Sequence, residues 1–300
     1  MRARIARLVL RISALLPLPV AHPVGAMTGW LLALFPNRQR LISTINIRRC
    51  FPDLDEPVRR QLVRRSLIET GKTALEVGAL WLWPRPQVLS LVKKVSGEEA
   101  LKEALAHGNG AIIAAPHLGA WEMVGLYCSA QYPMTSLYRP PRMAELDKMI
   151  RNARERCGAR LVPTDASGVR ALYKALGAGE LIGILPDQIP NTGNGLFAPF
   201  FGNDAYTMVL LSRLVQKTRA AVFFTYAERL PRGHGFHLHF VKADTGIGDP
   251  DPLKAVAALN RGVEQCVRSL PEQYQWSYRR FYMRPGGQLF HYNKSDLPTT

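Results

Sequence analysis

Acidic residues and cysteines are both scarce in this 300-residue chain. It holds 23 Asp and Glu against 39 Lys and Arg, which gives a formal net charge of +16. An excess of this size indicates an anionic partner, for which nucleic acid, a membrane surface, a phosphorylated ligand and an acidic protein are the candidates. The four cysteines lie far apart without a Cys-x-x-Cys pair. Their spacing argues against a disulfide scaffold and against a cysteine zinc site.

Two groups of motifs are also missing. The sequence has no helix-turn-helix, RNP or zinc-finger pattern, so we expect no nucleic-acid partner despite the positive charge. It has no G-x-S-x-G pattern either, and no cysteine adjoins the histidine discussed below, so we expect no nucleophile from the protein itself.

Charge is absent from residues 12–37, a stretch long enough in principle to span a bilayer. Pro17, Pro19 and Pro23 interrupt it, so we expect short helices instead of one straight span. The preceding residues form a basic amphipathic pattern of the kind that lies on anionic membranes. We therefore predict that residues 1–36 are helices that anchor the chain at a membrane. A secretory signal peptide and a helix packed on the core are the alternatives.

Residues 37–300 are predicted to form a single α/β domain. Its entry segment, residues 37–94, is helical and rich in arginine. From about Val95 strand and helix patterns alternate, which favours a mostly parallel or mixed central sheet flanked by helices.

Three chemically active side chains directly follow predicted strands: His117 after "AIIAA", Arg139 after "MTSLY" and Asp187 after "ELIGILP". Ligands of open α/β sheets bind beyond the carboxyl ends of the strands. We therefore expect these residues to converge on one crevice.

His117 and Glu122 form a His-x-x-x-x-Glu pair in "PHLGAWE". Within one helix, residues five apart diverge, so the two side chains can meet only if His117 stands in a turn before the helix. Glu122 would then orient the imidazole of a general base that activates a substrate hydroxyl. Backbone N–H groups at the start of the helix are candidate oxyanion donors. The alternative is a buried histidine that is hydrogen-bonded to a nearby acid.

"HLGAWE" resembles the H-x4-D/E (HX4E) signature of the glycerolipid and lysophospholipid acyltransferase superfamily. The chain more closely resembles the lipid A biosynthesis lauroyl/myristoyl (secondary) acyltransferases. The similarity extends from "NIRRCFPD" at Asn46, through "LYRP", "ARERCG", "GILPDQ" and "APFFGNDAYT", to "YQWSYRRFYMRP". Two departures bear on the acceptor and on chain length: "RPPRM" lacks the family's asparagine, and Tyr278 replaces a histidine.

The resemblance implies transfer of a fatty acyl chain from acyl carrier protein to a hydroxyl of a phosphorylated lipid A precursor such as Kdo2-lipid IVA. It implies action at the cytoplasmic face of a bacterial inner membrane, with acyl carrier protein as donor and no further cofactor. The arginines between Arg38 and Arg65 are the expected docking surface for the acidic carrier. Another lipid acceptor, such as a lysophospholipid, and a noncatalytic membrane-associated protein are the alternatives. The expected catalytic residues are His117 and Glu122, and the expected substrate-binding residues are Arg139, Arg154, Asp187, Gln188, Phe200 and Gly202.

The segment "HGFHLHF" contains His234, His237 and His239. On a strand, His237 and His239 would share a face. No carboxylate or cysteine lies near them in the pattern, and the chemistry proposed needs no metal, so we expect none here.

Overall fold

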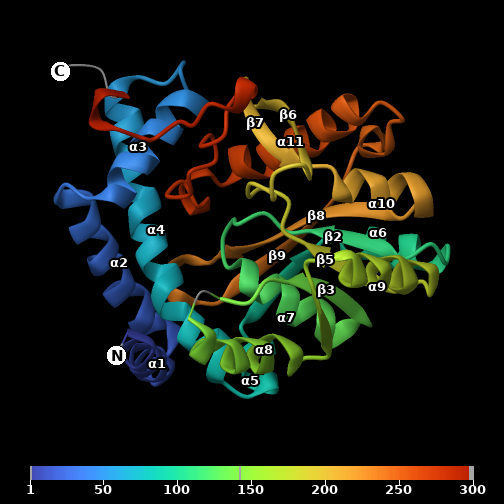
Figure 1. Ribbon diagram of the computed structural model, residues 1–300. Coiled ribbons are helices and arrows are strands. Elements are labelled where there is room, and N and C mark those ends of the chain that lie inside the picture. Colours follow the sequence, from blue (N-terminus) through green and yellow to red (C-terminus); the bar gives the residue numbers. More distant parts are fainter. Residues whose placement is uncertain (1, 142, 297–300) are drawn as a thin grey trace.

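The computed structural model describes residues 2–141 and 143–296 (Figure 1). Within them a seven-stranded sheet has the order β1-β9-β8-β2-β5-β3-β4, in which β8 and β9 are antiparallel and the other neighbours are parallel. The predicted mixed, mostly parallel sheet is confirmed. The strands are β1 (Val92–Ser96), β2 (Ala111–Ala114), β3 (Met134–Tyr138), β4 (Ala159–Pro163), β5 (Leu181–Ile184), β8 (Ala221–Arg229) and β9 (Phe236–Lys242).

The central strand β2 is buried on both faces. Ala111 and Ile113 belong to one hydrophobic core, and Ile112 and Ala114 to the other. This alternation follows from the two-residue period of a strand. The core with Ala111 and Ile113 includes residues of α5 (Arg85–Leu89), α6 (Glu98–Ala106) and α7 (Trp121–Gln131). The core with Ile112 and Ala114 includes residues of α9 (Ala166–Gly177), α10 (Leu210–Thr218) and α11 (Pro252–Ser269). A further helix, α8 (Asp147–Glu155), packs beside β3 and β4.

A second, two-stranded sheet was missed in the sequence. Residues 195–208 form a hairpin of β6 (Gly195–Phe200) and β7 (Asn203–Met208), and α10 begins after it at Leu210. Phe201 and Gly202 form its two-residue turn, both with positive φ (49° and 70°). Such a turn matches the twist of the two strands.

Four helices precede the sheet: α1 (Arg2–Ala14), α2 (Leu18–Leu34), α3 (Arg38–Cys50) and α4 (Glu56–Leu82). Gly25 and Gly29 of α2 contact the backbone of α4 around Gly71 so closely that a Cβ at any of these positions would overlap the opposite helix. Small residues allow this approach of two helix backbones. Helix α2 therefore packs firmly on α4.

A buried ionic network ties these helices to the end of β8. The guanidinium of Arg229 donates two hydrogen bonds to the carboxylate of Glu76 on α4, and His22 of α2 contacts the same carboxylate at 3.1 Å. Burial raises the pKa of Glu76, but the charges and hydrogen bonds of Arg229 and His22 outweigh it and lower the pKa below its ordinary value. Arg229 also donates to the carbonyl of Gly119 at 2.8 Å, so the network reaches the turn that carries His117.

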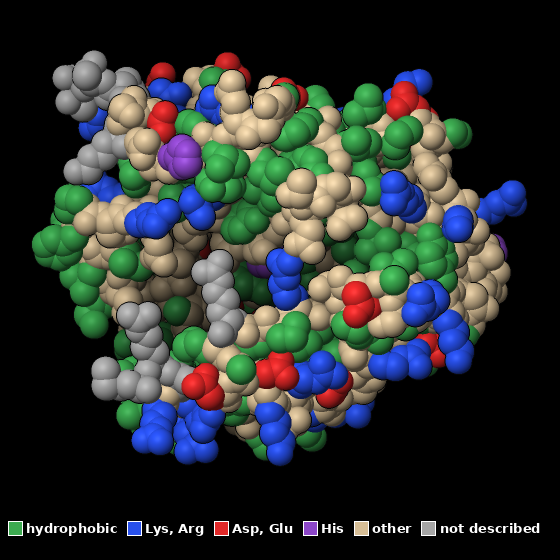
Figure 2. Space-filling model, in the orientation of Figure 1, with side chains coloured by type: hydrophobic (Ala, Val, Ile, Leu, Met, Phe, Trp, Pro, Cys, Tyr) green, Lys and Arg blue, Asp and Glu red, His purple; other side chains and the backbone are tan. Residues whose placement is uncertain are grey.

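The outer faces of α1 and α2 remain apolar and exposed. The residues concerned are Ile5, Leu8, Val9, Ile12, Val20, Val24, Met27, Trp30, Leu31 and Leu34. Hydrophobic side chains cover the left edge of the molecule over α2 (Figures 1 and 2). Among the described residues no single helix passes a length and hydropathy test for a membrane span, whereas α2 and α3 pass it together across an 80° bend.

Candidate active site

His117 lies in the turn between β2 and α7, as the spacing predicts. Gly119 has φ +62°, and a Cβ there would overlap the carbonyl oxygen of Ala227 on β8. The turn is held from both sides, because Ala120 N–H donates to the Ala227 carbonyl and Gly119 N–H donates to that of Gln273, at 2.8 and 3.0 Å. Only a glycine fits this position without strain.

Asp187 is the partner that orients His117. Its carboxylate accepts two hydrogen bonds of 2.8 Å, one from Nδ1 of the ring and one from the backbone N–H of the same residue. The other ring nitrogen, Nε2, lies 3.0 Å from the amide nitrogen of Gln188. These contacts assign the proton to Nδ1 and the lone pair to Nε2.

The charge of Asp187 is stabilised although the residue is buried. Burial raises the pKa of its carboxyl, but the electrostatic interaction with His117 and the two hydrogen bonds from this residue outweigh that effect and lower the pKa below its ordinary value. An ionised carboxylate at Nδ1 fixes the tautomer and supports a protonated ring.

Glu122 does not orient His117, so this part of the sequence prediction is wrong. Its carboxylate instead accepts two hydrogen bonds from Arg154, one of them 3.0 Å from Nε, and one of 3.1 Å from the indole of Trp81. Burial raises the pKa of Glu122, but Arg154 and Trp81 together lower it below its ordinary value. Glu122 lies in the first turn of α7, and its side chain contacts Trp81 of α4 and Arg154 of α8 instead of the turn that carries His117.

The expected oxyanion donors of the turn are also engaged elsewhere. The N–H groups of His117, Leu118, Gly119 and Ala120 donate to Asp187, Pro116, Gln273 and Ala227 respectively. These four N–H groups of the turn are therefore not free to bind a reacting oxyanion.

His117 opens into a cavity of about 950 Å³. Figure 2 shows this face hollowed between the part with α10, α11 and the hairpin and the part with α8 and α9, with Lys and Arg side chains around the hollow. Leu137, Ile184 and Leu185 line its apolar wall and also line a second, mostly apolar cavity of about 70 Å³ against α7. The basic side chains that line the larger cavity are Arg139, Arg154, Arg170, Arg213 and Lys217.

Four predicted substrate-binding residues come together here. Arg139, Arg154 and Gln188 line the cavity, and Asp187 lies behind His117. Arg139 donates to the Asn191 side chain at 2.6 Å.

Phe200 and Gly202 are placed differently from the prediction. Phe200 is buried beside Phe281 and beneath the guanidinium of Arg280, and Gly202 forms the hairpin turn. Neither residue lines either cavity. Phe200 and its neighbour Phe201 are buried and belong to the hydrophobic core.

Sequence patterns did not predict that the C-terminal segment supports the turn that carries His117. The C-terminal segment holds the turn: Gln275 N–H donates to the His117 carbonyl at 3.0 Å, and the hydroxyl of Tyr278 accepts from Ile189 N–H at 3.0 Å. Tyr278 therefore supports the loop after Asp187, from the place where the family has a histidine. Arg229, a charged residue that ends an apolar strand, is another residue whose role the sequence analysis missed.

Comparison with known proteins identifies the family of the chain. The chain is 28% identical to the lipid A biosynthesis lauroyltransferase of Escherichia coli K12 over 91% of this chain and 88% of the relative. The palmitoleoyltransferase of lipid A biosynthesis from the same organism is also 28% identical, with the same coverage. The myristoyltransferase is 23% identical over 95% of this chain and 88% of the relative. Residues 4–283 match the family model of the bacterial lipid A biosynthesis acyltransferases, and the chain therefore belongs to that family of enzymes.

Proposed function

We propose that the protein transfers a fatty acyl chain from acyl carrier protein to a hydroxyl of a phosphorylated lipid A precursor such as Kdo2-lipid IVA, with His117 as general base. The observation that carries this proposal is the His117–Asp187 pair at a cavity of about 950 Å³. Nε2, the nitrogen with the lone pair, is the one beside Gln188, which lines the cavity.

The proton has a complete route in this arrangement. Nε2 of His117 removes the proton of the acceptor hydroxyl as its oxygen attacks the thioester carbonyl. The tetrahedral intermediate then collapses, the C–S bond breaks, and the thiolate takes the proton from Nε2. Asp187 stabilises the imidazolium formed between these steps. The thioester is already activated, so the reaction needs no cofactor beyond the acyl donor.

Gln188 is the side-chain donor best placed for the oxyanion. Its amide nitrogen lies 3.0 Å from Nε2, so it adjoins any hydroxyl that reaches this nitrogen. The reacting hydroxyl would displace this contact and leave the amide N–H free for the carbonyl oxygen. Glu122 acts at a distance by fixing Arg154 at the cavity wall, where a cation suits a phosphorylated substrate.

The apolar wall suits the acyl chain, and the basic side chains suit the phosphates or the acidic carrier. Among the arginines expected to receive the carrier, Arg48, Arg59 and Arg60 are engaged by Glu56 at 2.6–3.3 Å. Arg64 and Arg65 are exposed on α4, and we assign the docking role to them.

The exposed apolar faces of α1 and α2 support attachment to the anionic cytoplasmic face of a bacterial inner membrane. Replacing Leu8, Ile12 and Met27 by Gln tests this part, because each exposed side chain loses apolar surface without disturbing the packing on α4. We expect the triple variant to lose cosedimentation with anionic vesicles while keeping its melting temperature. Undiminished cosedimentation would locate the attachment elsewhere.

One assay tests the activity. Purified protein is incubated with acyl carrier protein charged with a fatty acid and with either a lipid A precursor or a lysophospholipid as acceptor. We expect acylation of the precursor, its loss in His117→Gln, and its retention in His107→Gln, which changes an exposed histidine. Acylation of the lysophospholipid alone would favour the alternative acceptor, and inactivity toward both acceptors would favour the noncatalytic alternative.

A further inference from the structure

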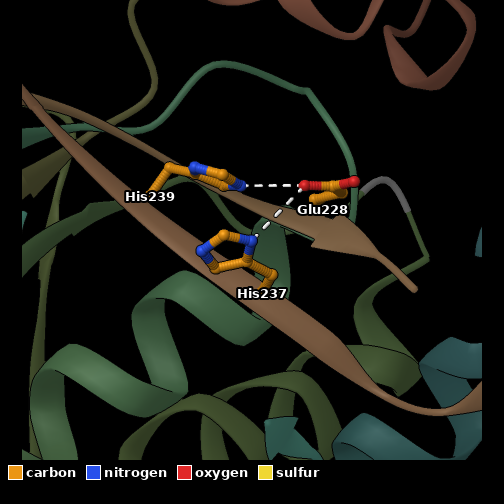
Figure 3. Close-up of side chains that lie close together, drawn as sticks. All are labelled: Glu228, His237 and His239. Atoms are coloured by element: carbon orange, nitrogen blue, oxygen red, sulfur yellow. Dashed lines mark hydrogen bonds and ion pairs between the residues drawn. The ribbon is translucent and has the colours of Figure 1, made fainter. Parts of the chain in front are cut away.

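Three potential metal ligands meet on neighbouring strands, away from the residues that line the candidate active site. His237 and His239 lie on β9, and Glu228 lies opposite His237 in the antiparallel register with β8. Because strand side chains alternate, both histidines share a face with the carboxylate. Figure 3 shows both imidazoles directed at Glu228.

The distances suit a common ion. Nε2 of His239 lies 2.9 Å from Oε2 of Glu228, and Nδ1 of His237 lies 3.6 Å from the same oxygen. One ligand atom from each of the three residues lies within 4.8 Å of the others. Tetrahedral Zn²⁺ with ligands at about 2.0–2.1 Å requires separations of about 3.4 Å, so small side-chain rotations are sufficient.

The surroundings hold the rings in place. Ser96 Oγ on β1 lies 2.8 Å from Nε2 of His237, and when this nitrogen donates to Ser96 the lone pair of Nδ1 faces Glu228. The ring of Tyr226 stacks on His239 with centroids 4.6 Å apart. A metal-binding histidine commonly has its second nitrogen fixed in this way.

We propose that Glu228, His237 and His239 bind a late first-row divalent cation, with Zn²⁺ preferred and water as the fourth ligand. Two imidazoles and one carboxylate favour such an ion over Mg²⁺, which takes oxygen ligands. The three side chains are 12–32% exposed, which leaves access for the ion and the water.

The earlier expectation of no metal rested on the lack of a carboxylate near these histidines in the chain. Glu228 lies nine residues before His237 and becomes its neighbour only through strand pairing. That premise no longer holds.

The role of the ion would be structural. The residue after Glu228 is Arg229, which binds Glu76 and the carbonyl of Gly119. An ion that joins β8 to β9 at Glu228 restrains the strand end that supports the His117 turn. It takes no part in acyl transfer.

Titration calorimetry on metal-free, tag-free protein tests the proposal. We expect one equivalent of Zn²⁺ to bind, Mg²⁺ not to bind, and Zn²⁺ to raise the melting temperature. His239→Gln and Glu228→Gln should each weaken Zn²⁺ binding by at least about 100-fold, and Ser96→Ala by about 10-fold, as for outer-shell partners elsewhere. His234→Gln is the matched control, because His234 belongs to the same motif but is exposed and outside the cluster.

Failure to bind one equivalent of Zn²⁺ would overturn the proposal. Equal Zn²⁺ affinity in wild type, His239→Gln and Glu228→Gln would also overturn it, since binding would then be adventitious. Glu228 is partly exposed, so Glu228→Gln is expected to fold and keeps the test decisive if His239→Gln does not. Acyl transfer is not the readout, so this result is independent of the proposed function.

Discussion

Replacing Asp187 by Asn should abolish most activity by reversing the tautomer of His117. The carboxylate accepts from both Nδ1–H and the backbone N–H of His117, at 2.8 Å each. Asparagine has a single acceptor oxygen. The backbone N–H cannot change its role, so that oxygen must face it, and the amide NH₂ then faces Nδ1. The ring must accept at Nδ1, which moves its proton to Nε2 and removes the base.

We expect kcat to fall by about 10³–10⁴-fold, the size of effect that loss of an orienting aspartate has in a catalytic triad. The KM values should change little, because the substituted atoms lie behind the ring and not against the substrate. The measurement is steady-state acyl transfer at saturating donor and acceptor, with melting temperature as the check on folding. The double variant with His117→Ala should be no slower than His117→Ala alone, because the two residues act as one unit.

Glu122→Gln provides the contrast. It also removes the charge of a carboxylate, but of one that contacts Arg154 and Trp81 instead of His117. We expect it to raise the acceptor KM more than it lowers kcat. If Asp187→Asn turns over at a near-normal rate, or if Glu122→Gln alone reproduces the full loss of kcat, the assignment of Asp187 as the orienting residue is refuted.

Four further outcomes follow. Gly119→Ala should lower the melting temperature and kcat together, because its Cβ would overlap a carbonyl oxygen; a stable, active variant would contradict the turn geometry. Glu76 has a lowered pKa, so its charge contributes stability above about pH 4.5 that is lost as pH falls through the folded pKa. The Glu76→Gln variant should therefore be less stable than the wild type at pH 7, by about 3–5 kcal/mol, and its stability should depend less on acid pH in thermal melts. Parallel curves of stability against pH for the two proteins would argue against this. Gly125 lines the smaller cavity and has open space at its Cβ position. Gly125→Leu should therefore reduce kcat/KM for longer acyl donors relative to shorter ones. An unchanged ratio would place the acyl chain elsewhere. Replacing Arg64 and Arg65 by Ala should raise the KM for acyl carrier protein several-fold at low salt and less at high salt. A KM that does not depend on salt would show that the carrier docks elsewhere.

The sequence by itself determined the alternation of strands and helices in the main sheet and the place of the histidine. The apolar run before Pro116 had to be a buried strand, and a histidine in the turn after it had to lie at the carboxyl edge of the sheet. These conclusions depend on local periodicity and on chain direction, and both are evident from the amino-acid sequence. The family could be recognised from the order of the motifs for the same reason.

Tertiary structure alone decided which acid reaches the ring. Glu122 is five residues from His117 and Asp187 is seventy, yet parallel pairing of β2 with β5 brings Asp187 beside the turn while the direction of α7 carries Glu122 to Arg154. The same is true of Glu228, which strand pairing alone brings beside His237. Contacts between distant segments depend on strand order and helix direction, and no spacing along the chain encodes these.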